Sequence, residues 1–161
     1  MHKVPISIAA SVAVTERSRR TWWRRIADGK TTRLADDARG RAMLSLAEVV
    51  PLISIALSRD DLEFLVRADA GDADAQNDIG QLFSNADRPE AAFFWLDQAA
   101  KQGHADAMQW LGRCYIGGEG VDKDWNIGFM WIAKAAAHGH VIAQAQMQEW
   151  LQLAPSMLRR A

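Results

Sequence analysis

One seven-residue segment occurs three times in this sequence, at intervals of 32 and 36 residues. It reads Ala-Gly-Asp-Ala-Asp-Ala-Gln from Ala70, Gln-Gly-His-Ala-Asp-Ala-Met from Gln102 and His-Gly-His-Val-Ile-Ala-Gln from His138. The second half of the unit recurs as well, because the segment from Trp95 to Ala100 resembles the one from Trp131 to Ala136. A regular interval of this length indicates a repeat protein, in which each supersecondary unit packs on its neighbours.

The two intervals differ by four residues, and the difference falls between the two halves of the unit. The second unit has Gly-Gly-Glu-Gly-Val-Asp-Lys-Asp at 117–124, where the first has only Ser-Asn-Ala-Asp at 84–87. An insertion of this kind is typical of a surface loop between two helices. The sequence therefore predicts paired helices, and we expect them near 60–69, 73–84, 89–102, 105–116, 124–137 and 141–153.

Helix boundaries in these units have the expected residues. Pro89 falls at a predicted helix start, while Gly103 and Gly139 fall just past predicted helix ends, which is the usual placement of these residues. The adjacent Asp60 and Asp61 suit the first turn of a helix, where the macrodipole favours negative charge.

Small and large side chains alternate at equivalent positions of the units. Alanine and glycine at such positions allow close approach of helices, and aromatic and leucine side chains fill the space beyond. Trp95 and Trp131 are equivalent, so we expect both to belong to the core.

The Gly-x-x-x-Ala opening, the Gly-Glu-Gly-Val loop at 118–121 and the Trp-x-x-x-Ala-Ala close resemble the Sel1-like repeat, a relative of the tetratricopeptide repeat. The resemblance covers about residues 60–153 and implies an α-solenoid that binds proteins in a concave groove and catalyses nothing. In this class the first helix of each unit lines the groove, which implies a polar stripe of protein-binding residues. These are Asn77, Gln81, Gln109, Arg113 and Glu149.

The first 48 residues lack this period and differ in charge. They hold ten Lys and Arg against five acids, a net charge of +5, whereas residues 49–161 hold nine basic and fifteen acidic residues, a net charge of −6. A basic segment on an acidic body suggests that the basic part meets a polyanion.

Within this basic head, the sequence predicts a short helix over Ile6–Ala10, a turn over Val12–Thr15 and a second helix over Glu16–Ala27. Residues 32–46 suit a β-hairpin or wing. Ser45 and Glu48 have capping-box spacing and should open a further helix from Val49. Trp22 should be buried, and Trp23 partly on the surface.

At 100° per residue, Arg17, Arg20 and Arg24 fall on one stripe of the second helix. Arginines on a short helix that follows a tight turn can neutralise phosphates and bond guanine edges in a major groove. The run Arg-Arg-Thr-Trp-Trp-Arg-Arg-Ile that starts at Arg19 resembles the helix-turn-helix of excisionase-like and MerR-like domains. The implied DNA-binding residues are Arg17, Arg20, Thr21, Arg24, Arg25, Lys30, Arg39 and Arg41. A competing interpretation is that these arginines dock on an acidic protein surface.

No catalytic or cofactor-binding pattern accompanies these features. His104, His138 and His140 have no cysteine or carboxylate cluster to complete a metal site. The chain has neither a nucleophile elbow nor a phosphate-binding glycine loop. Cys114 excludes an internal disulfide, since it is the single cysteine. We therefore expect no enzyme activity, no metal and no cofactor.

These inferences predict an all-α fold, a short α-solenoid of Sel1-like repeats preceded by a small winged helix-turn-helix head. The predicted domains are the head at 1–48, a connecting helix at 49–58, the repeat array at 59–154 and a tail at 155–161. We expect a cytoplasmic regulator of transcription that binds DNA through the head, binds a protein through the repeats and can form a homodimer. The alternative is a cytoplasmic adaptor with no DNA role. No apolar run reaches the ~20 residues of a membrane span, and the apolar stretch at 4–14 resembles only a weak export signal.

Overall fold

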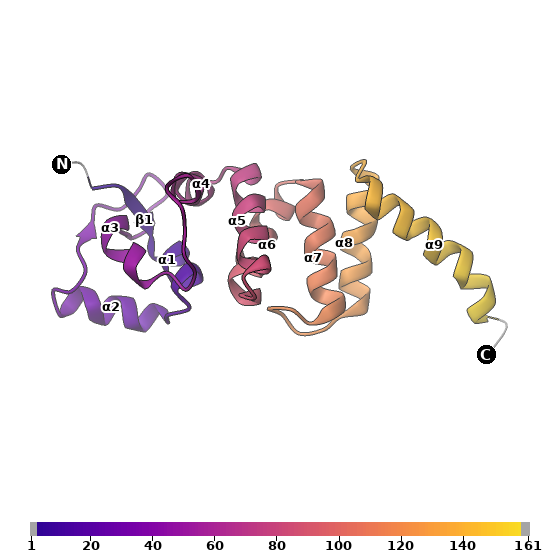
Figure 1. Cartoon of the computed structure of the whole chain (residues 1–161), viewed down its shortest axis with the longest axis horizontal. Helices are drawn as coiled ribbons and strands as arrows, with labels where there is room; N and C mark the ends of the chain where they lie inside the picture. Colours follow the sequence, from indigo (N-terminus) through magenta and orange to yellow (C-terminus); the bar gives the residue numbers. More distant parts are fainter. Residues whose placement is uncertain (1–2, 159–161) are drawn as a thin grey trace. The chain divides into compact units, whose positions relative to one another are not determined.

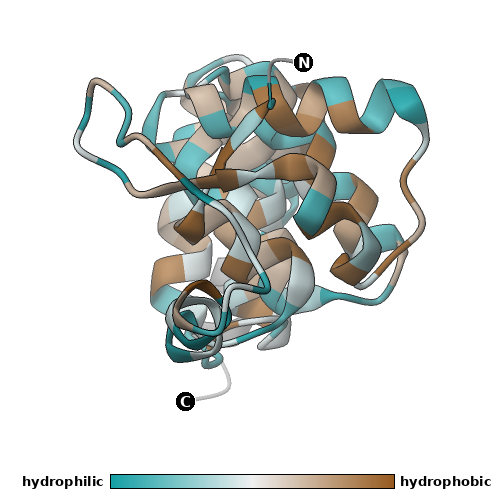
Figure 2. Ribbon diagram, turned by 90° about the vertical axis from the view of Figure 1, so that its left-hand side faces the viewer, coloured by the Kyte–Doolittle hydropathy of each residue, from teal (hydrophilic) through white to brown (hydrophobic). Residues whose placement is uncertain are grey.

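The computed structural model describes residues 3–158, with side chains to residue 153. Of the predicted tail at 155–161, residues 155–158 continue the last helix of the chain, and residues 159–161 lie outside the described residues. The chain divides into two compact units, one up to Ala75 and one from Gln76 onwards. The helices are amphipathic, and hydrophilic and hydrophobic residues alternate along the ribbon (Figure 2).

The first unit contains a three-stranded antiparallel sheet and several short helices (Figure 1). The sheet has the order β1-β3-β2, and in its register Ile6 pairs with Leu44 and Leu34 with Met43. The strands are β1 (Pro5–Ser7), β2 (Arg33–Leu34) and β3 (Met43–Ser45), and the helices are α1 (Ile8–Thr15), α2 (Arg19–Ala27), α3 (Leu46–Val49) and α4 (Arg59–Ala70). The predicted hairpin at 32–46 is formed by β2 and β3.

The beginning of the chain differs from the prediction, since it forms a strand followed by one continuous helix. Ser7 ends β1 and caps α1, its hydroxyl accepting a hydrogen bond from the Ala10 amide at 3.1 Å. The hydroxyls of Ser11 and Thr15 donate to backbone carbonyls one turn earlier, at 2.8 and 2.6 Å. These bonds satisfy the polar residues inside a buried helix, so the turn expected at 12–15 was wrong.

The turn lies instead at residues 16–18. Glu16 has a φ of 55° and ends α1 in the left-handed region. Ser18 then caps α2, its hydroxyl accepting from the Thr21 amide at 3.1 Å. The head thus has two helices joined by a three-residue turn, which is the connection of a helix-turn-helix. Trp22 is fully buried and Trp23 is 41% exposed, as predicted.

The single connecting helix expected at 49–58 is not formed. The structure has the four-residue α3, then one 3₁₀ turn at Val50–Leu52 with Pro51 in it, and no helix from Ile53 to Leu57. The Ser45 side chain makes no capping bond. Glu48 instead accepts hydrogen bonds from the backbone and hydroxyl of Thr32, which lower the pKa of its carboxyl. This carboxylate joins α3 to the start of the hairpin, which makes it unavailable to a capping box.

Helix α4 packs with the head unit, although the sequence analysis assigns it to the repeat array. Ser58 and Asp61 form a capping box at its start. Near its end, the buried Asp69 accepts hydrogen bonds from the Ser7 amide at 2.7 Å and the Ser7 hydroxyl at 2.6 Å. Arg41 donates to the same carboxylate at 2.8 Å. This network joins α4 to β1 and to the hairpin.

The second unit continues as an array of antiparallel helices (Figure 1). The helices are α5 (Ala73–Asn85), α6 (Pro89–Lys101), α7 (Ala105–Gly117), α8 (Trp125–Ala137) and α9 (Val141–Leu158). Each helix predicted from the repeat is therefore present, with boundaries within a few residues. Gly103 and Gly139 have positive φ in the turns, as their position at helix ends requires.

Two glycines decide how closely α7 and α8 approach. A Cβ on Gly112 would lie 2.5 Å from the Ile132 Cγ1 atom and 2.9 Å from the Gly128 carbonyl oxygen. A Cβ on Gly128 would lie 2.6 Å from Ile116. Any larger residue at either position would force the helices apart. This confirms the expectation that small residues at repeat positions allow close helix packing.

The equivalent tryptophans do not have equivalent surroundings. Trp95 is 1% exposed and belongs to the core, as predicted. Trp131 is only half-buried, and the Lys134 ammonium lies 4.6 Å from the centroid of its ring. The core position of α8 is filled by the neighbouring Ile132, which is 0% exposed. The prediction of Trp131 as a fully buried core residue was therefore wrong.

Candidate functional site

The first candidate site is a hollow of about 310 Å³ in the second unit. It is lined by side chains from α5, α7 and α9, each of which is the first helix of a repeat unit. The lining residues are Gln81, Asp106, Gln109, Trp110, Arg113, His140, Ile142 and Gln146. We call this hollow the groove. Three of the five residues that the sequence analysis assigned to protein binding, Gln81, Gln109 and Arg113, thus come together in it.

Arg113 contributes an exposed, positively charged side chain to the groove. Its guanidinium carbon lies 4.6 Å from the centroid of the Trp110 ring. Cation–π stacking on an indole restricts the conformations of the guanidinium while its N–H groups stay available. The arrangement can therefore receive a carboxylate or a backbone carbonyl from a bound chain.

Carboxamides line the rest of the polar wall. Gln109 is buried, and its amide donates to the Gln146 side-chain oxygen at 3.5 Å. Gln81 is half-buried on α5. A carboxamide offers both donors and an acceptor, so it can pair with the amide groups of an extended peptide.

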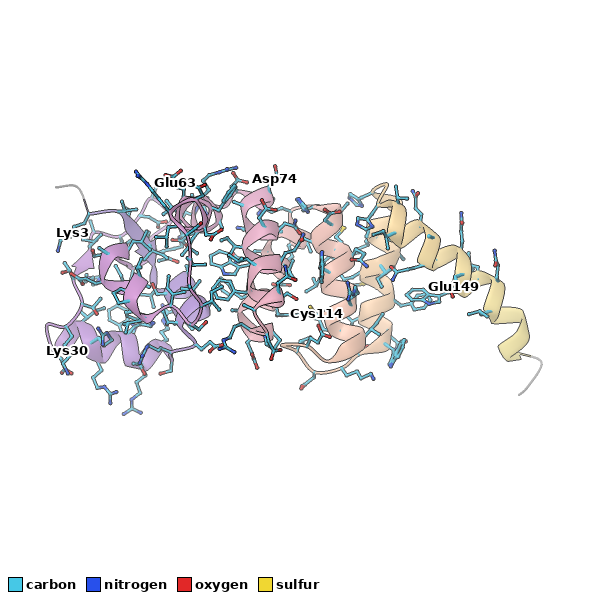
Figure 3. All side chains as sticks on the ribbon, in the orientation of Figure 1. Lys3, Lys30, Glu63, Asp74, Cys114 and Glu149 are labelled. Atoms are coloured by element: carbon cyan, nitrogen blue, oxygen red, sulfur yellow. The ribbon has the colours of Figure 1, made fainter. Side chains whose placement is uncertain are left out.

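Two of the predicted groove residues are less accessible than the sequence analysis expects. Asn77 is 4% exposed and Gln109 is 5% exposed, so neither belongs to an open polar stripe. A helix inside an array is covered on more than one side, as α7 is by α6 and α8. Glu149 is exposed on α9 (Figure 3), but it does not line the groove.

The histidines of the repeat cap helices. The Nδ1 atom of His104 accepts from the Ala107 amide at 3.2 Å, and that of His140 accepts from the Ala143 amide at 3.1 Å. With Nδ1 accepting, the Nε2 of His140 faces Asp106 at 2.9 Å. This capping role explains why a histidine follows the glycine in both repeats. Among the described residues, no group of three potential metal ligands occurs.

Cys114 is buried in α7, and burial raises the pKa of its thiol to about 11. Thiolate is the nucleophilic form of cysteine. At neutral pH this thiol is thus protonated and unreactive.

The second candidate site is the basic surface of the head, formed by the turn at 16–18 and helix α2. Arg17, Arg20 and Arg24 are exposed, and within the described part of the head they form no hydrogen bond or ion pair. Lys30 lies at the end of this segment (Figure 3), where its ammonium is 3.9 Å from the Asp28 carboxylate. These four cations remain available to an anionic ligand.

The other residues assigned to DNA binding are engaged within the head. Thr21 shares a hydrogen bond of 2.9 Å with the Ser18 hydroxyl. Arg25 donates to the Thr31 hydroxyl at 3.1 Å and lies over the Trp22 ring. Arg39 donates to the Ala70 carbonyl oxygen at 2.7 Å, at the end of α4.

Arg41 has a structural role that its sequence position does not reveal. It donates to Asp37 at 2.7 Å and to Asp69 at 2.8 Å. Partial burial by itself would lower the pKa of Arg41, but the two carboxylates raise it above its usual value. The backbone amide of Arg41 also bonds Asp37 and, with its side chain, lowers the pKa of that carboxyl. These ion pairs hold the Arg41 side chain between the hairpin and α4. Its guanidinium group is therefore not free to contact DNA.

The array of paired antiparallel helices defines this part of the chain as an α-solenoid module of the interaction type. The sequence matches the Sel1 repeat over residues 73–104 and again over 105–140. Residues 73–140 are therefore two Sel1 repeats, as the sequence analysis predicted. The match begins after α4 and ends immediately before α9.

Two solved structures are similar to this chain. One is a protective antigen present in uropathogenic Escherichia coli strains and displays an SLR fold, with 31% identity over 59% of this chain and a TM-score of 0.54. The other is a Sel1 repeat protein from Oxalobacter formigenes, with 26% identity over 66% of this chain and a TM-score of 0.53. This chain spans only 21% of the first structure and 33% of the second.

These similarities confirm the Sel1-type solenoid. Sel1 repeats mediate protein–protein interaction. Within the described residues, no helix is both long enough and apolar enough to cross a bilayer.

Proposed function

We propose that this chain is a cytoplasmic DNA-associated adaptor, in which the head contacts DNA and the groove of the Sel1 repeats binds a protein. The observation that supports DNA contact is the set of unpaired arginines on α2 and on the turn before it. A single small helix-turn-helix usually acts as one of two copies on DNA, which also favours a homodimer.

The arrangement of the head supports this proposal. A three-residue turn joins α1 to α2. In a helix-turn-helix the second helix enters the major groove, and α2 holds that position here. Arg20 and Arg24 are one turn apart on α2, so their guanidinium groups project from the same side. Arg17 extends this surface towards the turn, and Lys30 extends it beyond the helix end. Arg25 supports the end of α2 from within the head, through its hydrogen bond to Thr31 and its position over the Trp22 ring.

Replacing Arg20 and Arg24 with alanine should weaken binding of the full chain to duplex DNA by more than tenfold. Each lost phosphate contact also removes about 0.9 from the slope of log affinity against log salt. Thermal stability should not change, because exposed and unpaired arginines contribute little to folding. Binding is measured by fluorescence anisotropy across a salt series.

The matched control replaces Arg59 and Lys101 with alanine, which removes the same charge at exposed positions on α4 and α6. It should bind DNA as the wild-type chain does. If the Arg20 and Arg24 variant also bound normally, α2 would not be the recognition helix. If the wild-type chain bound no DNA even at low salt, the head would instead dock on an acidic protein, and the chain would be an adaptor without a DNA role.

The groove supports the protein-binding part of the proposal. It is lined by α5, α7 and α9, so a bound segment would contact both repeats at once. Its polar wall holds carboxamides, one stacked guanidinium and the Asp106 carboxylate beside His140, and these donors and acceptors suit a peptide in extended conformation. Stacked repeats form extended concave surfaces of this kind, and single globular domains lack them.

Charge reversal in the groove, by Arg113→Glu together with Gln81→Glu, should abolish capture of the partner from cell lysate by the tagged chain. The guanidinium is lost and two carboxylates replace donors, while helix content and DNA affinity should stay unchanged. The readout is mass spectrometry of captured proteins. The control Lys101→Glu reverses one charge on α6, outside the groove, and should keep the partner. An unchanged set of captured proteins would move the binding surface away from the groove.

A further inference from the structure

The groove continues beyond the residues described above. A second hollow, of about 410 Å³, lies at the turn before α9. It shares Asp106, His140 and Ile142 with the groove, so the two hollows form one continuous surface. We call the second hollow the extension. Its remaining lining residues are Ala105, His138, Gly139 and Val141.

The extension offers mainly aliphatic surface to a bound segment. Val141 and Ile142 are the first two residues of α9, and they are 76% and 61% exposed. The Nε2 atom of His140 already faces Asp106 at 2.9 Å, and its Nδ1 atom caps α9. Single exposed aliphatic residues are common on protein surfaces, but two neighbours that line one hollow suit a large apolar side chain of a partner.

The groove offers a positive charge to the same segment. Within the part of the chain that the structure describes, Arg113 forms no ion pair, and its guanidinium stacks on Trp110. A guanidinium can bind a carboxylate through two parallel hydrogen bonds. Residues 49–161 carry a net charge of −6, which would repel a run of acids. A single acidic residue of the partner therefore suits Arg113.

Helix geometry sets the distance between these two features. Asp106 and Arg113 both line the groove, and they are seven residues apart on α7. Seven residues correspond to about 10 Å along a helix axis. Ile142 lies at the Asp106 end, because both residues line the two hollows and Asp106 contacts His140. An extended chain covers about 10 Å in three residues.

We propose that the groove and the extension together bind an extended peptide segment that carries one acidic residue three positions from a large apolar residue. The acid pairs with Arg113, the apolar side chain packs on Val141 and Ile142, and the carboxamides of the groove bond the peptide backbone between them. The proposal rests on protein binding by the groove and adds the chemistry of the partner. It does not depend on DNA binding.

The test is selection of phage-displayed random dodecapeptides on the immobilised full chain. The wild-type chain should enrich peptides with Asp or Glu three positions from a large apolar residue. Affinities of a selected synthetic peptide are then measured by fluorescence anisotropy. Arg113→Glu should weaken its binding by more than tenfold, and a peptide with Lys in place of the acid should restore binding to this variant. Only a direct ion pair predicts such a rescue.

A second variant tests the apolar end. Val141→Glu combined with Ile142→Glu should select peptides that keep the acid and lose the apolar residue. Both changes lie in the first turn of α9, where carboxylates favour a helix, and circular dichroism verifies the fold. The matched control is Leu151→Glu, an exposed residue of α9 outside both hollows, which should keep both preferences.

The outcomes separate this proposal from the function on which it rests. Enriched peptides without the acid and apolar residue at this separation would overturn the proposal, and so would an Arg113→Glu variant that Lys in the peptide does not rescue. In both cases the groove would remain a peptide site. A wild-type chain that enriches no peptide would instead contradict peptide binding by the groove itself, and this proposal with it.

Discussion

Trp95→Ala is expected to lower the free energy of unfolding by about 3–5 kcal/mol, the usual cost of truncating a buried aromatic side chain. Trp95 is 1% exposed, and its ring packs edge-on against Phe94, with centroids 4.9 Å apart. The substitution removes this contact area and leaves a cavity in the core, beside the middle of α6. Denaturant unfolding followed by circular dichroism measures the effect.

The matched variant is Trp131→Ala, which makes the same change at the equivalent position of the next repeat. It should cost clearly less, because Trp131 is half-buried and its ring already faces solvent beside Lys134. Because both variants replace a tryptophan with alanine, the difference between their losses of stability reports on the burial of the side chain and not on the residue type. Equal losses of stability would show that Trp131 is as buried as Trp95 in solution.

Asp69→Ala should destabilise the first unit by about 3 kcal/mol. The carboxylate is 7% exposed and accepts three hydrogen bonds, two from Ser7 and one from Arg41. Removing one partner of a buried ion pair costs about 3–5 kcal/mol, because the other is left without compensation. The lower value applies here, since the Arg41 side chain is 30% exposed.

Hydrogen–deuterium exchange of peptides from residues 3–75, followed by mass spectrometry, reports on this unit. Asp36→Ala is the control, because Asp36 pairs only with Arg33 and both side chains are more than 40% exposed. An exposed pair of this kind contributes about 1 kcal/mol or less. An Asp69 variant as stable as the control would mean that α4 is not anchored through this carboxylate.

The sequence predicts those parts of the structure that depend on interactions between residues close together in the chain. The six helices from α4 to α9 were predicted within a few residues, because helix signals are local and recur in each unit. The glycines at 71, 103 and 139 have positive φ, as helix ends of this type require. The burial of Trp22 followed from its position opposite the arginines of α2.

The strand β1 could not be read from its own residues. Three residues carry little strand signal, and this strand exists because Ile6 pairs with Leu44, far along the chain. The helix expected at 49–58 failed for the same reason, since the backbone amide and the hydroxyl of Ser54 both donate to the Val14 carbonyl oxygen of α1. In both cases a long-range contact replaced the local preference.

The candidate sites show the same division. The sequence alone determined that the chain ends in stacked helix pairs of the Sel1 type and that its head has a basic helix, because both follow from residue spacing. Only the tertiary structure decided which polar residues are available for binding. Asn77 and Gln109 are both buried, Gln109 because α7 has α6 and α8 as neighbours, and Arg41 is held by the carboxylates of Asp37 and Asp69. Spacing along one helix predicts a face, but what covers that face depends on segments that the spacing does not describe.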